Sequence, residues 1–250
     1  MTQREVIGRY RGSMLGLLWS FATPLLMLAI YTFVFGVVFK VRLNQVESSD
    51  DQLGFALYLF SGLIVFNLFS ECISRAPGLI LANVNYVKKV IFPLEILPWV
   101  TLGAALFHAG TSLIVLLVCL LTFGHDISWN ILWLPIILLP FLLLIIGLSW
   151  LLTSVGVFIR DVGQVVGMAL TVLLFMSPIF YPLSALPDNI RNYLFLNPLT
   201  FIVEQIRAVV LLGQSPNWDC LTVYYIISLG VAWFGSLWFE KTRKGFADVM

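Results

Sequence analysis

The chain has 250 residues, of which 60% are hydrophobic and only 11% are charged. Soluble domains carry roughly 45–50% apolar and about 25% charged residues, so a water-soluble fold of this length could not bury the excess. The formal net charge of +1 gives no indication of nucleic-acid binding. The composition predicts an all-α integral membrane protein, in which the placement of charges along the chain is more informative than their sum.

A short basic segment, residues 1–12, precedes the first apolar run. Its apolar side chains share one helical face, and its arginines lie where they can meet lipid phosphates. The apolar residues are Val6, Ile7 and Tyr10, and the cations are Arg4, Arg9 and Arg11. We expect an amphipathic helix in the inner membrane interface. The alternative is an ordinary basic flank of the first span.

Six runs are long and apolar enough to cross a bilayer, since a helix needs about 20 apolar residues to span a hydrocarbon core roughly 30 Å thick. They cover residues 14–39, 54–74, 99–123, 131–158, 162–181 and 219–239. The first run leads to no small-residue cleavage site, which indicates a retained span and not a signal peptide. We expect residues 1–250 to form a single transmembrane domain.

The segment between the last two runs is apolar but carries charge. A seventh span over residues 194–212 would bury Glu204 and Arg207 near the bilayer centre, at about 2.5–3.5 kcal/mol each. Its apolar residues follow helical spacing, so one face can lie in lipid or protein. Those residues are Leu199, Ile202, Val203, Ile206, Val209 and Val210. We predict an external hairpin over residues 182–212, re-entrant or interfacial, in which Glu204 and Arg207 form a structural ion pair.

The distribution of cations favours six spans with both termini in the cytoplasm. Ten of the 14 Lys and Arg residues then lie inside, as the positive-inside rule requires. The inner set is Arg4, Arg9, Arg11, Arg75, Lys88, Lys89, Arg160, Lys241, Arg243 and Lys244, and the outer set is Lys40, Arg42, Arg191 and Arg207. A seventh span would place the cations of residues 241–244 outside.

The loop between the second and third spans, residues 75–92, has amphipathic spacing. Apolar residues recur at steps of four, three and four, with polar and basic residues between them. The apolar positions are Ile80, Val84, Val87 and Ile91, and the basic positions are Lys88 and Lys89. This pattern predicts a short cytoplasmic helix that a soluble partner could bind. The alternative is a helix that only rests on the membrane.

No motif for covalent chemistry or ATP binding is present in the sequence. The chain lacks a phosphate-binding loop, and His108 and His125 cannot assemble a zinc site at standard spacing. The three cysteines lie far apart and are interpreted as small apolar residues. We therefore expect no catalytic residue, metal or cofactor in this chain. Energy for any work must come from an ion gradient or from another subunit.

The few charged residues beside the spans lie near the inner membrane boundary. Glu71 and Arg75 are four residues apart, in the favourable order for a structural ion pair on a helix. Glu95 lies where the third span begins, and Arg160 and Asp161 form a turn after the fourth. Because none of them lies at the midplane, the pattern disfavours a proton-coupled carrier and favours a mechanically driven one.

Three separated blocks of sequence carry a resemblance to a known family. They are RYRGSMLGLLW at residues 9–19, VIFPLEILP at residues 90–98, and a third block with Arg160-Asp161-Val162, SPIFYP at residues 177–182 and Asn197-Pro198-Leu199. In this order and over nearly the whole chain, they resemble the ABC-2-type polysaccharide export permeases. That family comprises O-antigen, capsule and teichoic-acid exporters, and the closest likeness is to the O-antigen exporters.

The resemblance implies a transporter subunit and not an enzyme. Two copies of the chain would form a channel above two copies of a separate ATPase, which binds ATP and magnesium. Residues 75–92 would be the coupling helix, with Ile80, Val84, Val87, Lys88 and Lys89 at the contact and the Arg160-Asp161 turn as a second contact. Residues 182–212 would be the external gate hairpin. The implied cargo is lipid-linked polysaccharide, with O-antigen as the expected class, moved outward across the bacterial inner membrane.

An aromatic stripe on the first span is a candidate channel lining. Aromatic faces can contact the apolar C–H faces of sugar rings while the hydroxyls stay in water. The stripe consists of Met27, Tyr31, Phe35 and Phe39, with Tyr181 near the expected exit. The alternative is that these side chains face lipid or pack within the protein.

Two other functions remain open from the sequence. An ABC-2 permease for a small lipophilic molecule or drug would share the fold and differ in its gene neighbourhood. A membrane-embedded glycosyltransferase or acyltransferase would need a cluster of carboxylates or histidines at one membrane face. The acidic residues Glu71, Glu95 and Asp161 lie on different predicted elements, which argues against such an enzyme.

Overall fold

The computed structural model describes residues 1–38, 51–83, 93–123, 127–183, 186–187, 189, 193–194 and 197–246. Within these ranges every regular element is helical. The longer helices are α1 (Thr2–Tyr10), α2 (Trp19–Tyr31), α3 (Asp51–Arg75), α5 (Ile96–Thr122), α6 (Leu134–Phe158), α7 (Val162–Met176), α9 (Pro198–Val210) and α10 (Trp218–Arg243). Short turns of 3₁₀ helix form η1 (Gly16–Leu18), η3 (Ala76–Gly78), η4 (Leu81–Asn83) and η5 (Trp129–Trp133), and η2 (Thr32–Val38) is π-helical.

Five helical segments are long and apolar enough to cross a membrane. They are Gly16–Phe35, Gly54–Gly78, Ile96–Thr122, Trp129–Phe158 and Trp218–Arg243. This result confirms the prediction of an all-helical, multi-pass membrane protein. Each segment contains most of a predicted span, and its ends lie at most four residues from the predicted ends.

The predicted fifth span is shorter than expected. The helix α7 has 15 residues and is therefore about 22 Å long, against the roughly 30 Å of a bilayer core. It ends at Met176, five residues before the predicted end, and Ser177 has extended backbone angles of φ −87° and ψ 147°. The cause is Pro178, because the residue before a proline is sterically pushed out of the helical region.

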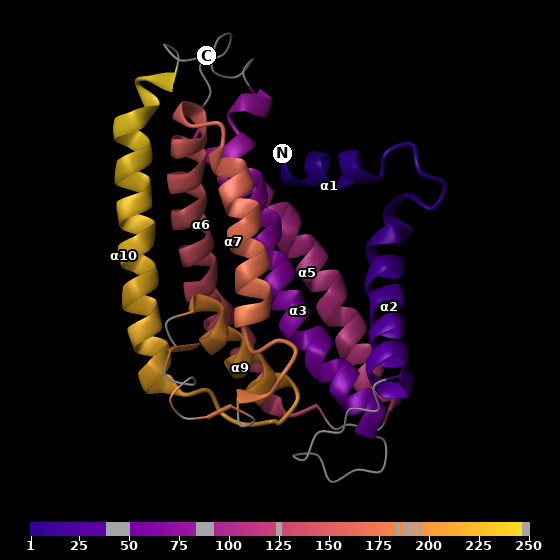
Figure 1. Ribbon diagram of the computed structural model, residues 1–250. Helices are drawn as coiled ribbons and strands as arrows, with labels where there is room; N and C mark the ends of the chain where they lie inside the picture. Colours follow the sequence, from indigo (N-terminus) through magenta and orange to yellow (C-terminus); the bar gives the residue numbers. More distant parts are fainter. Residues whose placement is uncertain are drawn as a thin grey trace.

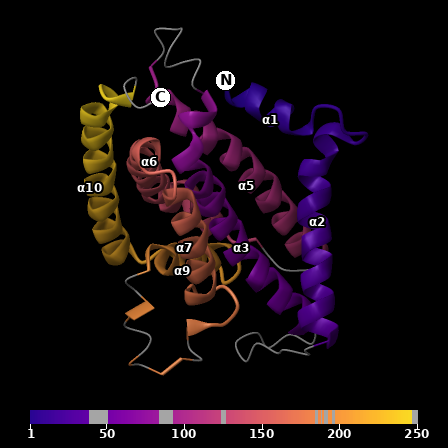
Figure 2. The ribbon, with the colours of Figure 1, turned by 45° about the horizontal axis from the view of Figure 1, so that its top comes forward.

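The spans lie side by side, and both termini lie at the same end of them (Figure 1). At that end, α1 lies across the bundle, and the turn from α6 to α7 and the start of α5 are found there too. The short helix α9 lies at the opposite end, beneath α3 and α6. In both views α2 and α10 stand at opposite edges of the bundle (Figure 2). The two ends of the bundle are therefore formed by different elements.

The helix α3 is the centre of the core, because 72% of its apolar stretch is buried inside the chain. Its neighbours α5, α7 and α9 all pack on it. By contrast, only 11% of the stretch that contains α2 is buried. Most of the α2 surface is thus available to lipid or to another protein chain.

The helices α6 and α10 approach each other closely through glycines. A Cβ atom added to Gly147 would lie 2.7 Å from the backbone of Ala232, and one added to Gly235 would collide with the carbonyl oxygen of Gly147. Small residues of this kind allow two backbones in a membrane to approach and to gain dispersion contacts. This contact fixes α10 against the rest of the bundle.

Candidate functional site

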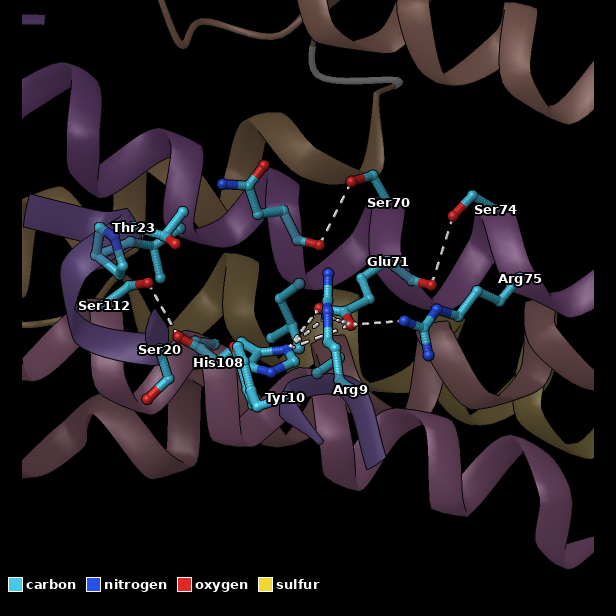
Figure 3. Close-up of a pocket in the computed structure, with 16 residues that line it drawn as sticks. Arg9, Tyr10, Ser20, Thr23, Ser70, Glu71, Ser74, Arg75, His108 and Ser112 are labelled. Carbon is cyan, nitrogen blue, oxygen red and sulfur yellow. Dashed lines mark hydrogen bonds and ion pairs between the residues drawn. The ribbon is translucent and has the colours of Figure 1, made fainter. Parts of the chain in front are cut away.

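A polar cavity of about 450 Å³ lies between α1, α2, α3 and α5 (Figure 3). It is found at the end of the bundle that holds the termini, since α1 forms one of its walls. Its polar lining residues are Arg9, Tyr10, Ser20, Thr23, Asn67, Ser70, Glu71, Ser74, Arg75, His108 and Ser112. In a chain with so few charged residues, this concentration marks the cavity as the candidate site.

The carboxylate of Glu71 is the centre of an ion cluster in this cavity. Arg9 Nη1 donates to Glu71 Oε1 at 2.6 Å, and His108 Nδ1 lies 3.1 Å from Glu71 Oε2. Arg75 Nη2 lies 3.5 Å from Glu71 Oε1, and its Nη1 donates to Glu5 at 3.3 Å. Since Arg9 and Glu5 belong to α1, and His108 belongs to α5, the cluster joins three helices.

The sequence predicts one contact of this cluster but not the others. The pairing of Glu71 with Arg75 was predicted from their spacing, and the two side chains lie together in the structure. The contacts of Glu71 with Arg9 and His108 span 62 and 37 residues of sequence, and nothing in the local pattern indicated them. The i,i+4 spacing is a property of one helix, whereas these contacts depend on how helices pack.

Four serine hydroxyls of the cavity are oriented in one way. Ser20 donates to the carbonyl of Leu17 at 2.8 Å, and Ser112 donates to the carbonyl of His108 at 2.9 Å. Ser70 and Ser74 likewise donate to carbonyls one turn earlier in α3. A hydroxyl that donates its proton to a backbone carbonyl still has lone pairs that can accept a hydrogen bond from a ligand. The lining therefore offers cationic donors and neutral acceptors together.

The helix α1 is held at this site mainly by polar contacts. Among its residues only Val6 is buried, and Thr2 fills the space beside Gly103 of α5, where an added Cβ would lie 2.7 Å from the threonine methyl. The remaining links are the ion pairs of Arg9 and Glu5 described above and an edge-on ring contact of Tyr10 with His108, whose centroids lie 6.0 Å apart. The interfacial helix predicted for residues 1–12 is thus a helix over Thr2–Tyr10 that is tied to the cavity.

The predicted coupling segment is only partly within the described residues. Val84, Val87, Lys88 and Lys89 lie outside them. Up to Asn83 the chain forms two 3₁₀ turns, η3 and η4, where a single amphipathic helix was expected. Pro77 stands inside this stretch and packs its backbone on Gly156 of α6. Proline lacks an amide proton and so interrupts a regular helix.

Ile80 of the same segment is completely buried. It belongs to a small core of six apolar residues at the end of the bundle that holds the termini. These residues are Ile80, Leu94, Leu97, Val157, Phe239 and Phe246. Ile80 is therefore an anchor within the chain, and its side chain has no exposed surface that a partner could contact. Arg160 and Asp161 are exposed in the turn before α7, where a partner could reach them.

The aromatic stripe does not line the polar cavity. Met27 is exposed, while Tyr31 packs partly against the main core. The ring of Phe35 lies 5.6 Å from that of Phe55 in α3, and Phe39 is outside the described residues. Tyr181 is half-buried after the end of α7 and donates to the carbonyl of Phe175 at 3.3 Å.

The second predicted ion pair lies at the opposite end of the bundle. Arg207 is 2% exposed and donates to Glu204 at 3.1 Å. Its guanidinium also donates to the carbonyls of Tyr58, Pro178 and Ile179, and it lies over the ring of Tyr58 at 3.5 Å from the centroid. Among the described residues, no group of His, Cys, Asp and Glu is placed to hold a metal ion.

Comparisons with known proteins cover nearly the whole chain. Residues 1–211 match the sequence family described as ABC-2 type transporter. Over 99% of its length the chain is 29% identical to the O-antigen export system permease protein RfbA of Myxococcus xanthus, of which 93% is covered. It is 25% identical over its full length to RfbA of Klebsiella pneumoniae, of which 93% is covered. The polysialic acid transport protein KpsM of Escherichia coli is 27% identical over 96% of the chain and 91% of that protein.

Proposed function

Because this chain belongs to the ABC-2 type transporter family, we propose that it is the membrane permease of an exporter that carries lipid-linked polysaccharide across the bacterial inner membrane. The observation that carries the proposal is the end-to-end similarity to permeases named for O-antigen export. Relatives named for polysialic acid and capsule polysaccharide transport point to the same class of cargo. The cargo is a glycan on a lipid anchor, with O-antigen as the expected class.

The proposal includes six crossings, with both termini in the cytoplasm. The position of both termini at one end of the bundle supports an even number of crossings (Figure 1). The cations of α1, the α6–α7 turn and the last turn of α10 gather at that end, as the positive-inside rule requires for the cytoplasmic side. The helix α7 and the residues after it make the fifth crossing, and α9 is part of a re-entrant external gate.

The energy is supplied by a separate ATPase. We assign two copies of this chain and two copies of the ATPase to the working complex, and the ATPase binds ATP and magnesium. Val84, Val87, Lys88, Lys89 and the Arg160-Asp161 turn are the contacts, and Ile80 anchors the contact segment to α6 and α10. The burial of Ile80 with Val157 and Phe239 supports this part, because a buried anchor can pass a push to the helices.

The channel forms where two copies of the chain meet along α2. The small buried share of α2, 11% of its apolar stretch, supports this placement. In this arrangement Met27, Tyr31, Phe35 and Phe39 provide the sugar-contacting surface, and Tyr181 lies at the exit. Aromatic rings suit a long glycan, since they bind repeated sugar units without fixing any one of them.

Co-purification and glycan export together test the proposed function. The chain is purified from membranes with the product of an adjacent ATPase gene, and surface glycan is measured in a deletion strain. We expect a complex with two copies of each subunit, and glycan trapped inside the deletion strain. A chain that purifies alone, with surface glycan unchanged on deletion, contradicts the proposal and favours a small lipophilic cargo.

A further inference from the structure

The polar cavity has two guanidinium groups that are accessible and face the same space. The side chains of Arg9 and Arg75 are 47% and 36% exposed, and both reach the Glu71 carboxylate. Figure 3 shows them on either side of that carboxylate. The planar guanidinium group matches the oxygen geometry of carboxylates and phosphates equally well. An entering phosphate can therefore take the place that the carboxylates hold.

The rest of the lining suits sugar hydroxyls. The hydroxyls of Ser20, Ser70 and Ser112 have given their protons to backbone carbonyls, so they face the cavity as acceptors. Asn67 adds an amide beside them. Sugar hydroxyls can donate to such acceptors, so a ligand with a phosphate at one end and a sugar next to it matches both kinds of lining group.

The location of the cavity suits a ligand with a lipid tail. It lies at the end of the spans that also holds α1 and the termini. One wall is the first part of α2, whose surface is largely unburied. A headgroup in the cavity can therefore keep its tail in the surrounding lipid while its sugar chain extends away from it.

We propose that this cavity is the entry site for the phosphate-bearing headgroup of the lipid-linked glycan, an inference that rests on the proposed function. Arg9 and Arg75 exchange the carboxylates of Glu71 and Glu5 for the phosphate. The hydroxyls of α2, α3 and α5 accept hydrogen bonds from the first sugar. Because Arg9–Glu71 and Arg75–Glu5 also hold α1 in place, this exchange frees α1 from α3 when cargo enters.

If this exchange occurs, replacing Glu71 and replacing either arginine should change phosphate affinity in opposite directions. Arg9→Gln and Arg75→Gln each remove a cationic donor and weaken phosphate binding by about tenfold or more. Glu71→Gln removes the competing anion and strengthens binding by a similar factor. A residue that served only to stabilise the fold would weaken binding when changed, so the gain in affinity identifies the exchange.

The probe for the test is farnesyl pyrophosphate, and farnesol is the matched lipid without phosphate. The transporter complex, in nanodiscs of phosphatidylcholine, is titrated with each compound, and elution volume verifies assembly of every variant. Arg11→Gln is the control for the arginine variants, because Arg11 lies two residues from Arg9 and does not line this cavity. We expect farnesyl pyrophosphate to bind and farnesol not to bind. The affinity for farnesyl pyrophosphate should change in the arginine and Glu71 variants as given above, and by less than twofold in the control.

Two further arms identify the source of the phosphate. If probe binding is lost in nanodiscs of phosphatidylglycerol, the cavity binds a membrane phospholipid. If inorganic pyrophosphate binds as tightly as the probe, the cavity binds a free anion. Either result overturns the proposal, and so does affinity that is unchanged in Arg9→Gln and Arg75→Gln. If the deletion strain still traps glycan in that case, the exporter function stands and only the cavity assignment fails.

Discussion

Arg207 is a cation in the interior of the protein, and its surroundings explain how that is possible. Three backbone carbonyls, those of Tyr58, Pro178 and Ile179, accept from its guanidinium, and Glu204 provides the countercharge. The carbonyls of Pro178 and Ile179 follow the break at the end of α7, where no helix continues to use them. One side chain thus joins α9 to α3 and to the end of α7.

Replacing Arg207 by methionine is expected to destabilise the protein strongly. The change leaves these buried carbonyls and Glu204 without their donor, and removing one partner of a buried ionic network costs about 3–5 kcal/mol. The unfolding temperature in detergent should fall by several degrees. Arg11→Met, at an exposed position, should stay within about 0.5 kcal/mol of the original chain. Equal melting of the two variants would contradict this role for Arg207.

The residue scale also shows what local spacing can predict. Both predicted ion pairs, Glu71 with Arg75 and Glu204 with Arg207, lie within salt-bridge distance in the structure. Each pair is separated by one helical turn, so its geometry follows from the helix alone. The carbonyl partners of Arg207 come from residues 28, 29 and 149 positions away. Such partners depend on tertiary packing, which no local pattern encodes.

At the scale of elements, the glycines of α10 provide a matched pair for testing helix packing. Gly235 faces the backbone of Gly147 with no room for a Cβ atom, whereas nothing lies within 4 Å of a Cβ atom added to Gly230. Both lie inside α10, so valine has the same helix propensity at either position. Gly235→Val is expected to cost at least about 1–3 kcal/mol through overpacking.

The measurement is the yield and melting temperature of the two valine variants in detergent. Gly235→Val should lower both, because backbone atoms cannot move aside as a flexible side chain would. Gly230→Val should leave the melting temperature within a few degrees of that of the original chain. If the two variants melt together, the close contact between α6 and α10 is not needed for stability.

Helices were easier to predict than the breaks between them. Long apolar runs identify a span because the bilayer sets its length, and the cores of all five long spans were found in this way. The end of α7 was placed too late, although Pro178 carried the signal for it. The 3₁₀ turns of Ala76–Asn83 differ from the single helix that the apolar spacing predicts, because Pro77 interrupts a regular helix.

For the whole molecule, the proposed function implies that a push from the ATPase enters at the end of the bundle that holds the termini. The core around Ile80 connects the contact segment to α5, α6 and the last turn of α10. Arg243 of α10 also pairs with Glu95 at the start of α5. These links make that end of the bundle one mechanical unit, so a force on Ile80 reaches several spans together.

This arrangement predicts different consequences for the anchor and for the contact residues. Ile80→Ala removes a completely buried side chain and should cost about 2–5 kcal/mol of stability, as large-to-small core changes do. Lys88→Ala with Lys89→Ala should leave folding nearly unchanged and reduce both export and the stimulation of ATP hydrolysis. The reason is that coupling depends on contacts that differ between two states of the complex.

The two variants are compared by melting temperature, complex yield, ATPase rate and surface glycan. In the double lysine variant we expect normal melting together with export reduced severalfold. In Ile80→Ala we expect lower melting, with export falling in proportion to the amount of assembled complex. Full export and normal ATPase stimulation in the double variant would exclude Lys88 and Lys89 from coupling. The contact would then have to lie at Val84 and Val87 or at the Arg160-Asp161 turn, and the same four measurements on an alanine pair at each place would tell which.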